Sequence, residues 1–203
     1  PDTKIGRVGS LFVTRGEIQC LKDTEWLNDS VVNTVATLMV RSNPSVYLFS
    51  SFFVPKLRGP SSGCGYDYDG VAKWTRKRGV DVFTFKHLLF PVHEALHWSL
   101  VHVDVDARVL TTLDSLASSR APSADVAIIL RWLADEASFL GRPPTEWTAA
   151  HGTPPQQDNG RDCGVFLLKF IEAVATGTPL NDVKQADMPL YRRQFVLDIA
   201  ATV

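Results

Sequence analysis

Two β-rich runs in the middle of the chain constrain the fold more than any other feature. Residues 98–104 and 108–114 are rich in Val, Leu and Thr, and only the segment 105–107 separates them. Apolar and β-branched runs joined by so few residues are typical of a β-hairpin. If the hairpin turns about residues 105 and 106, cross-strand partners have numbers that add up to 211, and His97 then faces Asp114.

Helical patterns lie on both sides of this hairpin. Four segments carry apolar side chains at helical spacing or in a nearly continuous run and are predicted to be helices: residues 26–40, 125–140, 163–175 and 190–203. Asn28 or Asp29 can cap the first helix, and Gly141 can end the second. The remaining predicted elements are β-prone segments at 46–54, 88–93 and 146–150, a loop at 57–70 and a short helix at 71–78.

Strands in the middle of the chain with helices towards both ends predict an α+β layered domain. The length of 203 residues fits one domain over residues 1–203, in which residues 1–17 are left as an N-terminal extension. A chain of this length can bury a sizeable core without disulfides or metals.

Charge and cysteine content narrow the function classes. The net charge of −1 gives no bulk attraction to nucleic acid or to a membrane surface, and the basic run at 73–78 is interpreted as a solvated helix face. No apolar run approaches the ~18 residues of a membrane span. Cys20, Cys64 and Cys163 lie far apart and are odd in number, which indicates a reducing compartment without a disulfide framework. They also lack zinc-site spacing, so we expect no metal and no cofactor.

The predicted hairpin and one helix start can form an acid–base site. A carboxylate at Asp114 can hold the imidazole of His97 in one tautomer and stabilise its protonated form. Cys163 lies where a loop enters a helix, so backbone N–H groups and the helix dipole favour a thiolate there. The side chain of Gln157 and the backbone N–H of Cys163 are candidate donors to an oxyanion. Gly160, like Gly164, leaves room for the backbone of a substrate.

Each of these residues has a structural alternative when it is taken alone. Cys163 can be a small buried residue of an apolar helix, His97 a surface residue at a strand end, and Asp114 the opening of a turn. The ordered combination of His, Asp, Gln and Cys, each at the boundary of an element, favours catalysis.

Several short segments match a known family in chain order. They are EWLND (25–29), FF with KL (52–57), GY (65–66), VAKWT (71–75), FPVH (90–93), HWSL (97–100), LDS (113–115), QQDNGRDCGVF (156–166) and MP with RR (188–193). With these segments the chain resembles the Ulp/sentrin-specific family of cysteine proteases, which process SUMO and related ubiquitin-like proteins. The residues of its motifs are similar to those of eukaryotic, plant-type members. The segment 58–64, which contains Cys64, departs from the family pattern, and we expect this cysteine to be exposed and not catalytic.

The resemblance implies a fold and a set of catalytic roles. It implies a papain-like cysteine protease domain of the ubiquitin-like-protease type, with a central mixed sheet flanked by helices. His97 would be the general base, Asp114 its orienting partner, Cys163 the nucleophile and Gln157 an oxyanion donor.

The resemblance also implies how a substrate is read. Trp26 and Trp98 would flank a narrow tunnel for a terminal Gly-Gly, because two glycines allow flat aromatic walls to close on their backbone; core packing is the alternative for both tryptophans. Asp29 would pair with a basic residue of the ubiquitin-like partner, with a plain helix cap as the alternative. Gly160 would lie beside the substrate chain.

The implied function is a thiol protease that cleaves after the Gly-Gly of SUMO, in a precursor or in an isopeptide to a target lysine. The implied partners are SUMO and SUMO-conjugated proteins, acted on by a monomer in the nucleus or cytoplasm. Three alternatives remain: a protease for NEDD8 or ubiquitin on the same fold, a catalytically silent SUMO-binding module, and an acetyl-transferring branch that the paired tryptophans disfavour.

Overall fold

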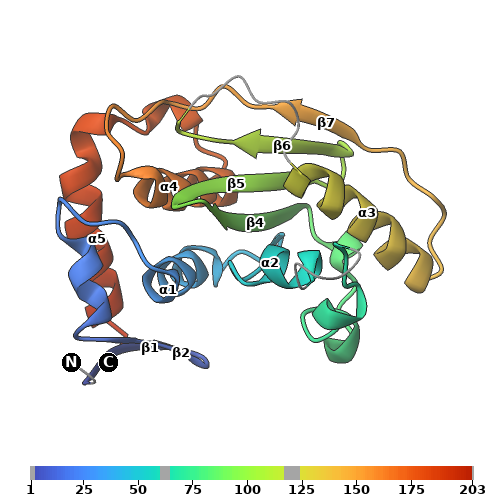
Figure 1. The fold of residues 1–203 in the computed structure, drawn as a ribbon, viewed down its shortest axis with the longest axis horizontal. Helices are drawn as coiled ribbons and strands as arrows, with labels where there is room; N and C mark the ends of the chain where they lie inside the picture. Colours follow the sequence, from blue (N-terminus) through green and yellow to red (C-terminus); the bar gives the residue numbers. More distant parts are fainter. Residues whose placement is uncertain (1–2, 60–64, 117–123, 203) are drawn as a thin grey trace.

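A five-stranded mixed sheet forms the centre of the computed structural model, which describes residues 3–59, 65–116 and 124–202 (Figure 1). The strands follow the order β3-β4-β5-β6-β7 and are β3 (Val46–Leu48), β4 (His87–Glu94), β5 (His97–Asp104), β6 (Val109–Leu113) and β7 (Thr148–His151). The β3–β4 and β6–β7 pairs are parallel, and the β4–β5 and β5–β6 pairs are antiparallel. The α+β class with a central mixed sheet is therefore confirmed.

Helices cover both faces of this sheet. They are α1 (Asp29–Val40), α2 (Phe53–Arg58), α3 (Ala124–Phe139), α4 (Cys163–Thr176) and α5 (Met188–Ala200). One core lies between the sheet and the helices α1, α4 and α5, and a second, rich in aromatic residues, lies between the sheet and α2 and α3. Alternate residues of β4 enter the two cores: Leu89 packs in the first, whereas Leu88 and Phe90 pack in the second. The middle of the sheet is thus buried on both faces, and its ends are where polar side chains reach solvent.

Most predicted helices form close to their expected bounds. The helices α3 and α4 begin and end within one residue of the sequence-based limits, and Gly141 and Gly177 follow them with positive φ. Asn28, rather than Asp29, caps α1, because its side chain accepts a hydrogen bond from the Val31 N–H at 2.9 Å. At residues 71–78 the structure has only the single 3₁₀ turns Asp69–Val71 and Arg76–Arg78.

The prediction of a strand over residues 46–54 is wrong beyond its first third. Only Val46–Leu48 is a strand, and Phe53 already begins α2. The Phe53 N–H bonds the Ser50 carbonyl at 2.9 Å, so the chain turns between the two elements. Phe49, Phe53 and Val54 are apolar because all three enter the second core, and a continuous apolar run does not reveal the type of element.

The predicted hairpin exists, but its register differs by two residues. Leu100 pairs with Leu113, so partner numbers add up to 213 and four residues form the loop instead of two. The loop is closed by the Asp104 carboxylate, which accepts from the Ala107 N–H at 2.9 Å, and by Arg108 at φ +57°. A shift by an even number leaves every side chain on its expected face of the sheet. Asp114 therefore follows the last β5–β6 pair and does not lie directly opposite His97.

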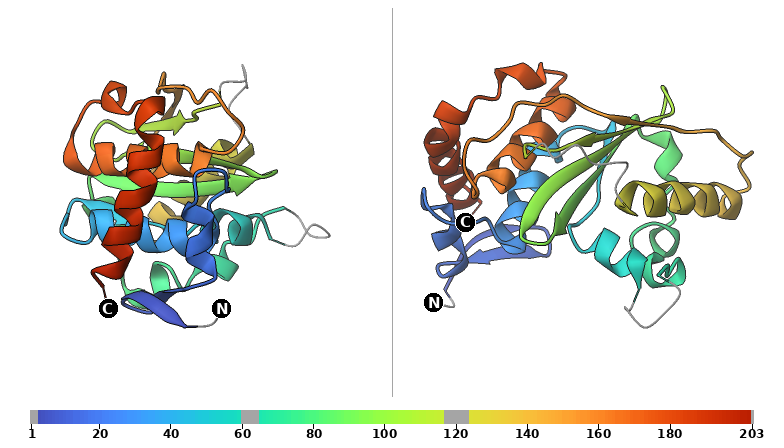
Figure 2. Two further views of the ribbon diagram at one scale, coloured as in Figure 1. Left: turned by 90° about the vertical axis from the view of Figure 1, so that its left-hand side faces the viewer. Right: turned by 45° about the horizontal axis from the view of Figure 1, so that its top comes forward.

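Residues 4–14 form a separate hairpin, β1 (Lys4–Val8) with β2 (Leu11–Thr14), that packs against α1 and the end of α5. Figure 2 shows this hairpin beside the C-terminus of the chain. A Cβ atom on Gly6 would lie 2.4 Å from the side chain of Ile199, so the contact requires glycine. Across the described residues, no helix combines the length and the apolar character that crossing a membrane requires.

Candidate active site

Cys163 is the first residue of α4 and is only 2% exposed. The preceding residue, Asp162, occupies the N-cap position, and its carbonyl accepts from the N–H groups of Val165 at 2.9 Å and Phe166 at 3.0 Å. The N–H groups of the first turn have no partners within the helix and give the helix start a partial positive charge. The thiol therefore lies where a negative charge is stabilised by the backbone.

His97 and Asp114 meet at the end of the sheet where α4 begins. His97 starts β5 and Asp114 follows β6, and their Nε2 and Oδ1 atoms are 2.7 Å apart. Asp114 is itself held by the Leu116 N–H, which donates to the same oxygen at 2.8 Å. The hydrogen bond to Asp114, and next the one to the Cys163 thiol, raise the pKa of His97 to about 9, although partial burial opposes this. With Nε2 bound to Asp114, Nδ1 is the ring nitrogen that remains for the thiol.

Gln157 is fixed to the residue that follows Asp114. Its backbone N–H donates to the Ser115 carbonyl at 2.8 Å, and its side-chain oxygen accepts from the Ser115 hydroxyl at 2.7 Å. One side-chain N–H donates to the Asn159 carbonyl. The second N–H of the same amide can donate to an oxyanion. The sequence offered no sign of Ser115 as this anchor, since a serine after an aspartate is common in turns.

The two tryptophans of the expected tunnel have different surroundings. Trp98 is 2% exposed, its indole N–H donates to the Leu27 carbonyl at 3.0 Å, and its ring stacks on His93 with 4.1 Å between centroids. Trp26 is 49% exposed. Both adjoin Leu27, one along the chain and the other through the hydrogen bond. Trp98 is therefore a rigid part of the core, and Trp26 lies at the surface beside it.

Asp29 connects α1 to two neighbouring segments. One carboxylate oxygen accepts from the Ser51 hydroxyl at 2.6 Å, and the other lies 3.9 Å from Nδ1 of His93. A third of the side chain remains exposed. The cap alternative does not hold, because Asn28 performs that role.

The two glycines near the thiol have separate roles. A Cβ atom on Gly164 would lie 2.9 Å from the Cβ of Leu27, so the space at Gly164 is filled by this chain and not left for a substrate. A Cβ atom on Gly160 would meet nothing within 4 Å. Only Gly160 keeps open space of the kind expected at both glycines.

The other cysteines do not join this arrangement. Cys20 is partly buried, and burial raises the pKa of its thiol. Cys64 and its loop, residues 60–64, lie outside the described residues, so the expectation that this cysteine is exposed stays a prediction. Within the described residues, no three His, Cys, Asp or Glu side chains gather as metal ligands would. At the start of β5 the structure brings together a thiol, an imidazole and a carboxylate.

A helix-start thiol beside a carboxylate-bound imidazole, on an α+β fold, is the arrangement of papain-like cysteine proteases. Residues 25–203 match the Ulp1 protease family, C-terminal catalytic domain, and the chain belongs to this family. It is 37% identical to sentrin-specific protease 2 of Homo sapiens over 93% of this chain and 32% of that protein, so it spans about a third of that relative's length. The putative ubiquitin-like-specific protease 1B of Arabidopsis thaliana is 32% identical over 90% of this chain and 56% of its own. The plant relative is thus no more similar than the human one.

The fold is shared with a solved structure of the same family. The C-terminal Ulp1 protease domain in complex with Smt3, the yeast ortholog of SUMO, superposes with a TM-score of 0.88 over 100% of this chain and 89% of that one, at 21% identity. At this identity the likeness establishes the fold.

Proposed function

We propose that this chain is a thiol protease domain, spanning residues 1–203, that cleaves after the C-terminal Gly-Gly of SUMO. The bond it hydrolyses is a peptide bond in a precursor or an isopeptide bond to a lysine of a target protein. The observation that carries the proposal is the 2.7 Å contact between His97 and Asp114. The imidazole of the same His97 also bonds the Cys163 thiol. The names of the relatives supply the substrate, since they are sentrin-specific and ubiquitin-like-specific proteases.

The residues support a two-step mechanism. His97 takes the proton of the Cys163 thiol, and the sulfur attacks the carbonyl carbon of the terminal glycine. The oxyanion that forms is held by the Gln157 amide and the Cys163 backbone N–H. The imidazolium then gives its proton to the departing amine, which leaves a thioester. Water, deprotonated by His97, attacks the thioester and releases the Gly-Gly carboxylate and the free thiol.

The unequal exposure of the tryptophans suggests how Gly-Gly is selected. Trp98, fixed through Leu27 and His93, forms a wall that does not move, and the exposed Trp26 closes over the glycine backbone from the other side. Gly160, three residues before Cys163, adds open space in the loop that leads to the nucleophile. The carboxylate of Asp29, whose side chain is one-third exposed, is available to a basic residue on the body of the modifier.

The same proposal covers partners and location. We propose that SUMO and SUMO-conjugated proteins are the partners, without nucleic acid or membrane, and that the chain acts as a monomer inside the cell, in the nucleus or cytoplasm. A protease for NEDD8 or ubiquitin is the alternative, because the surface that reads the modifier decides between them on one fold.

Hydrolysis of C-terminal aminomethylcoumarin fusions of SUMO, NEDD8 and ubiquitin tests the proposal. We expect kcat/KM to be highest for SUMO, and no turnover with Cys163→Ala. Cys20→Ala is the matched control and should leave turnover unchanged. Turnover of the ubiquitin fusion alone would show that the substrate is wrong, and turnover that survives in Cys163→Ala would show that the mechanism is wrong.

A further inference from the structure

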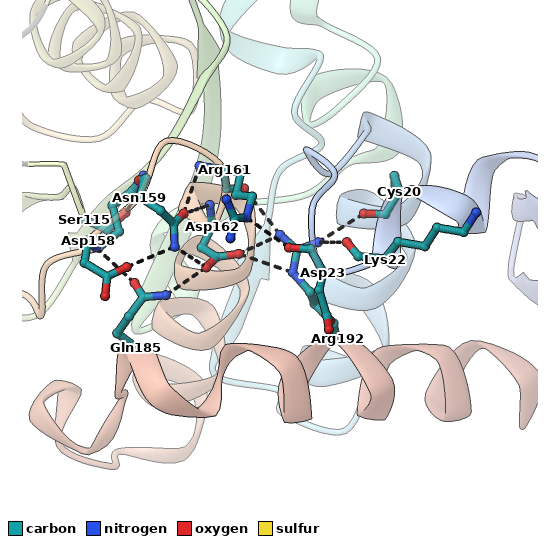
Figure 3. Close-up of polar contacts among 11 residues, drawn as sticks. Cys20, Lys22, Asp23, Ser115, Asp158, Asn159, Arg161, Asp162, Gln185 and Arg192 are labelled. Atoms are coloured by element: carbon teal, nitrogen blue, oxygen red, sulfur yellow. Dashed lines mark hydrogen bonds and ion pairs between the residues drawn. The ribbon is translucent and has the colours of Figure 1, made fainter.

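The carboxylate next to the nucleophile is buried and fully bonded. Asp162 is 4% exposed, and as the N-cap residue its side chain makes no bond to α4. It points instead towards α5, and its Oδ1 accepts from Nη2 of Arg192 on that helix at 2.7 Å. Its Oδ2 accepts from the side-chain amides of Asn159, in the loop before α4, and Gln185, in the turn before α5, both at 2.8 Å (Figure 3). Burial works against its charge, yet these hydrogen bonds hold the pKa of Asp162 below its ordinary value.

Arg192 connects this carboxylate to a distant segment. The side chain is 1% exposed, and Nη1 donates to the carbonyls of Cys20 at 3.1 Å and Lys22 at 3.0 Å. Nη2 also reaches the Arg161 carbonyl at 3.4 Å. A planar guanidinium with several fixed acceptors is rigid. The residue before the nucleophile is thus anchored to α5 and to the chain around residue 21.

The same network reaches the oxyanion donor. The side-chain oxygen of Asn159 accepts from the N–H groups of Arg161 at 3.0 Å and Asp162 at 3.1 Å, which shapes a turn. The carbonyl of that same Asn159 accepts from the Gln157 amide. Gln185 closes the loop from outside, because its side-chain oxygen accepts from the Asp158 N–H at 3.1 Å. One set of hydrogen bonds therefore fixes residues 157–163, which carry both the oxyanion donors and the thiol.

We propose that Asp162 is a positioning residue, which with Arg192, Asn159 and Gln185 sets the Cys163 thiol and the Gln157 amide in their reacting geometry. This inference rests on the proposed function. It assigns roles to residues that take no part in the two chemical steps described above. A displacement of the reacting groups by ~1 Å lowers the rate about 10²-fold. A disturbed carboxylate at position 162 should therefore lower kcat more than it changes KM.

Gln185→Glu gives the sharpest test. Asp162→Asn would leave the buried guanidinium of Arg192 without its counter-charge, which costs folding stability and obscures the result. Gln185→Glu keeps the shape and the acceptor for the Asp158 N–H, but it replaces the amide donor to Asp162 with a second carboxylate. Two carboxylates in contact cannot both stay ionised, so the pair must separate or take up a proton.

We expect Gln185→Glu to lower kcat on the SUMO fusion about tenfold at pH 8, with KM unchanged within about twofold. The ratio of wild-type to variant kcat should fall towards 1 as the pH is lowered, because the carboxylate pair then takes up a shared proton. Gln185→Ala should give a smaller loss that does not depend on pH. A merely structural role would lower the melting temperature without this acid recovery.

Gln194→Glu is the matched control on α5, the helix that follows the turn with Gln185. Its amide donates to the Asp198 carboxylate at 2.8 Å in an exposed position, so the change creates the same carboxylate pair away from the site. It should leave kcat unchanged at every pH. An identical kcat and pH profile for Gln185→Glu and wild type, or an equal loss in Gln194→Glu, would overturn the proposal.

Alkylation of Cys163 by iodoacetamide, followed by peptide mapping, separates this inference from the substrate assignment. The rate reports the thiol beside His97 and needs no SUMO, so a wild type inactive on every fusion would contradict the function alone. We expect Cys163 to be alkylated more slowly in Gln185→Glu than in wild type at pH 8. The difference between the two rates should shrink as the pH is lowered. Equal rates in wild type and variant would count against the positioning role.

Discussion

Replacing Asp114 with Asn tests how the Asp114 carboxylate acts on the imidazole of His97. The substitution keeps the size of the side chain but removes the charge that lies 2.7 Å from Nε2 of His97. That hydrogen bond is the largest cause that raises the pKa of His97 from 6.5 to about 9. We expect the pKa of His97 to fall towards 6.5 in Asp114→Asn.

The size of the effect follows from the same values. The rise from 6.5 to about 9 corresponds to about 3 kcal/mol in favour of the imidazolium. The His97 side chain is 20% exposed and Cys163 shares the stabilisation, so about 1–2 kcal/mol is assigned to Asp114 after solvent screening. A loss of about 1–2 kcal/mol predicts that kcat/KM falls about 5–30-fold.

Stability should change with pH in the matching direction. The folded-state pKa of His97 lies above its unfolded value, so the stabilisation is complete below pH 6.5 and is lost as pH rises through about 9. Asp114→Asn should flatten this part of the curve of unfolding free energy against pH. Histidine-labelled NMR titration measures the pKa directly, and Asp104→Asn, at the opposite end of β5, is the control that should leave His97 unchanged. A His97 pKa that remains near 9 in Asp114→Asn would refute this reasoning.

Three further outcomes follow from the structure. Trp98→Ala should lower the free energy of unfolding by about 3–5 kcal/mol in urea titrations, because a fully packed ring is lost; a change below about 1 kcal/mol would contradict its place in the core. Gly164→Ala should cost about 1–3 kcal/mol, because its Cβ would press on Leu27, whereas Gly160→Ala should cost less than about 0.5 kcal/mol; equal values would be the contrary result. Burial lowers the pKa of His102 to about 4, so neutral His102 contributes stability above pH 6.5 that is lost as pH falls towards 4. His102→Gln should reduce this acid loss in thermal melts, and an unchanged acid limb would count against it.

The parts of the site that the sequence predicted depend on local chemistry. Cys163 at a helix start was readable from an apolar run after a Gly- and Asp-rich turn, and the structure begins α4 at that residue. The approach of His97 to Asp114 survived a register error of two residues, because an even shift keeps the face of a strand. The error itself came from Arg108, whose positive φ lengthens the loop although nothing in its side chain marks a left-handed residue.

The parts that the sequence did not reveal depend on partners far along the chain. The indole of Trp98 donates to a carbonyl 71 residues away, and the bond between Arg192 and Asp162 spans 30 residues. No periodicity or spacing signal links such positions, and an aspartate beside a cysteine in a turn looks like any surface residue. The short β3 was hidden because the apolar run continues into α2, whose Phe53 and Val54 pack in the second core, whereas Val46 of β3 packs in the first.

The central claim is that Cys163 attacks the carbonyl carbon of the terminal glycine of the Gly-Gly sequence. The most direct measurement is the site of covalent attachment when the chain reacts with SUMO that carries a C-terminal vinyl methyl ester, mapped by peptide mass spectrometry. We expect one adduct, on Cys163, which is absent in Cys163→Ala and forms much more slowly in His97→Ala. An adduct on Cys20 or Cys64, or capture that persists in Cys163→Ala, would contradict it.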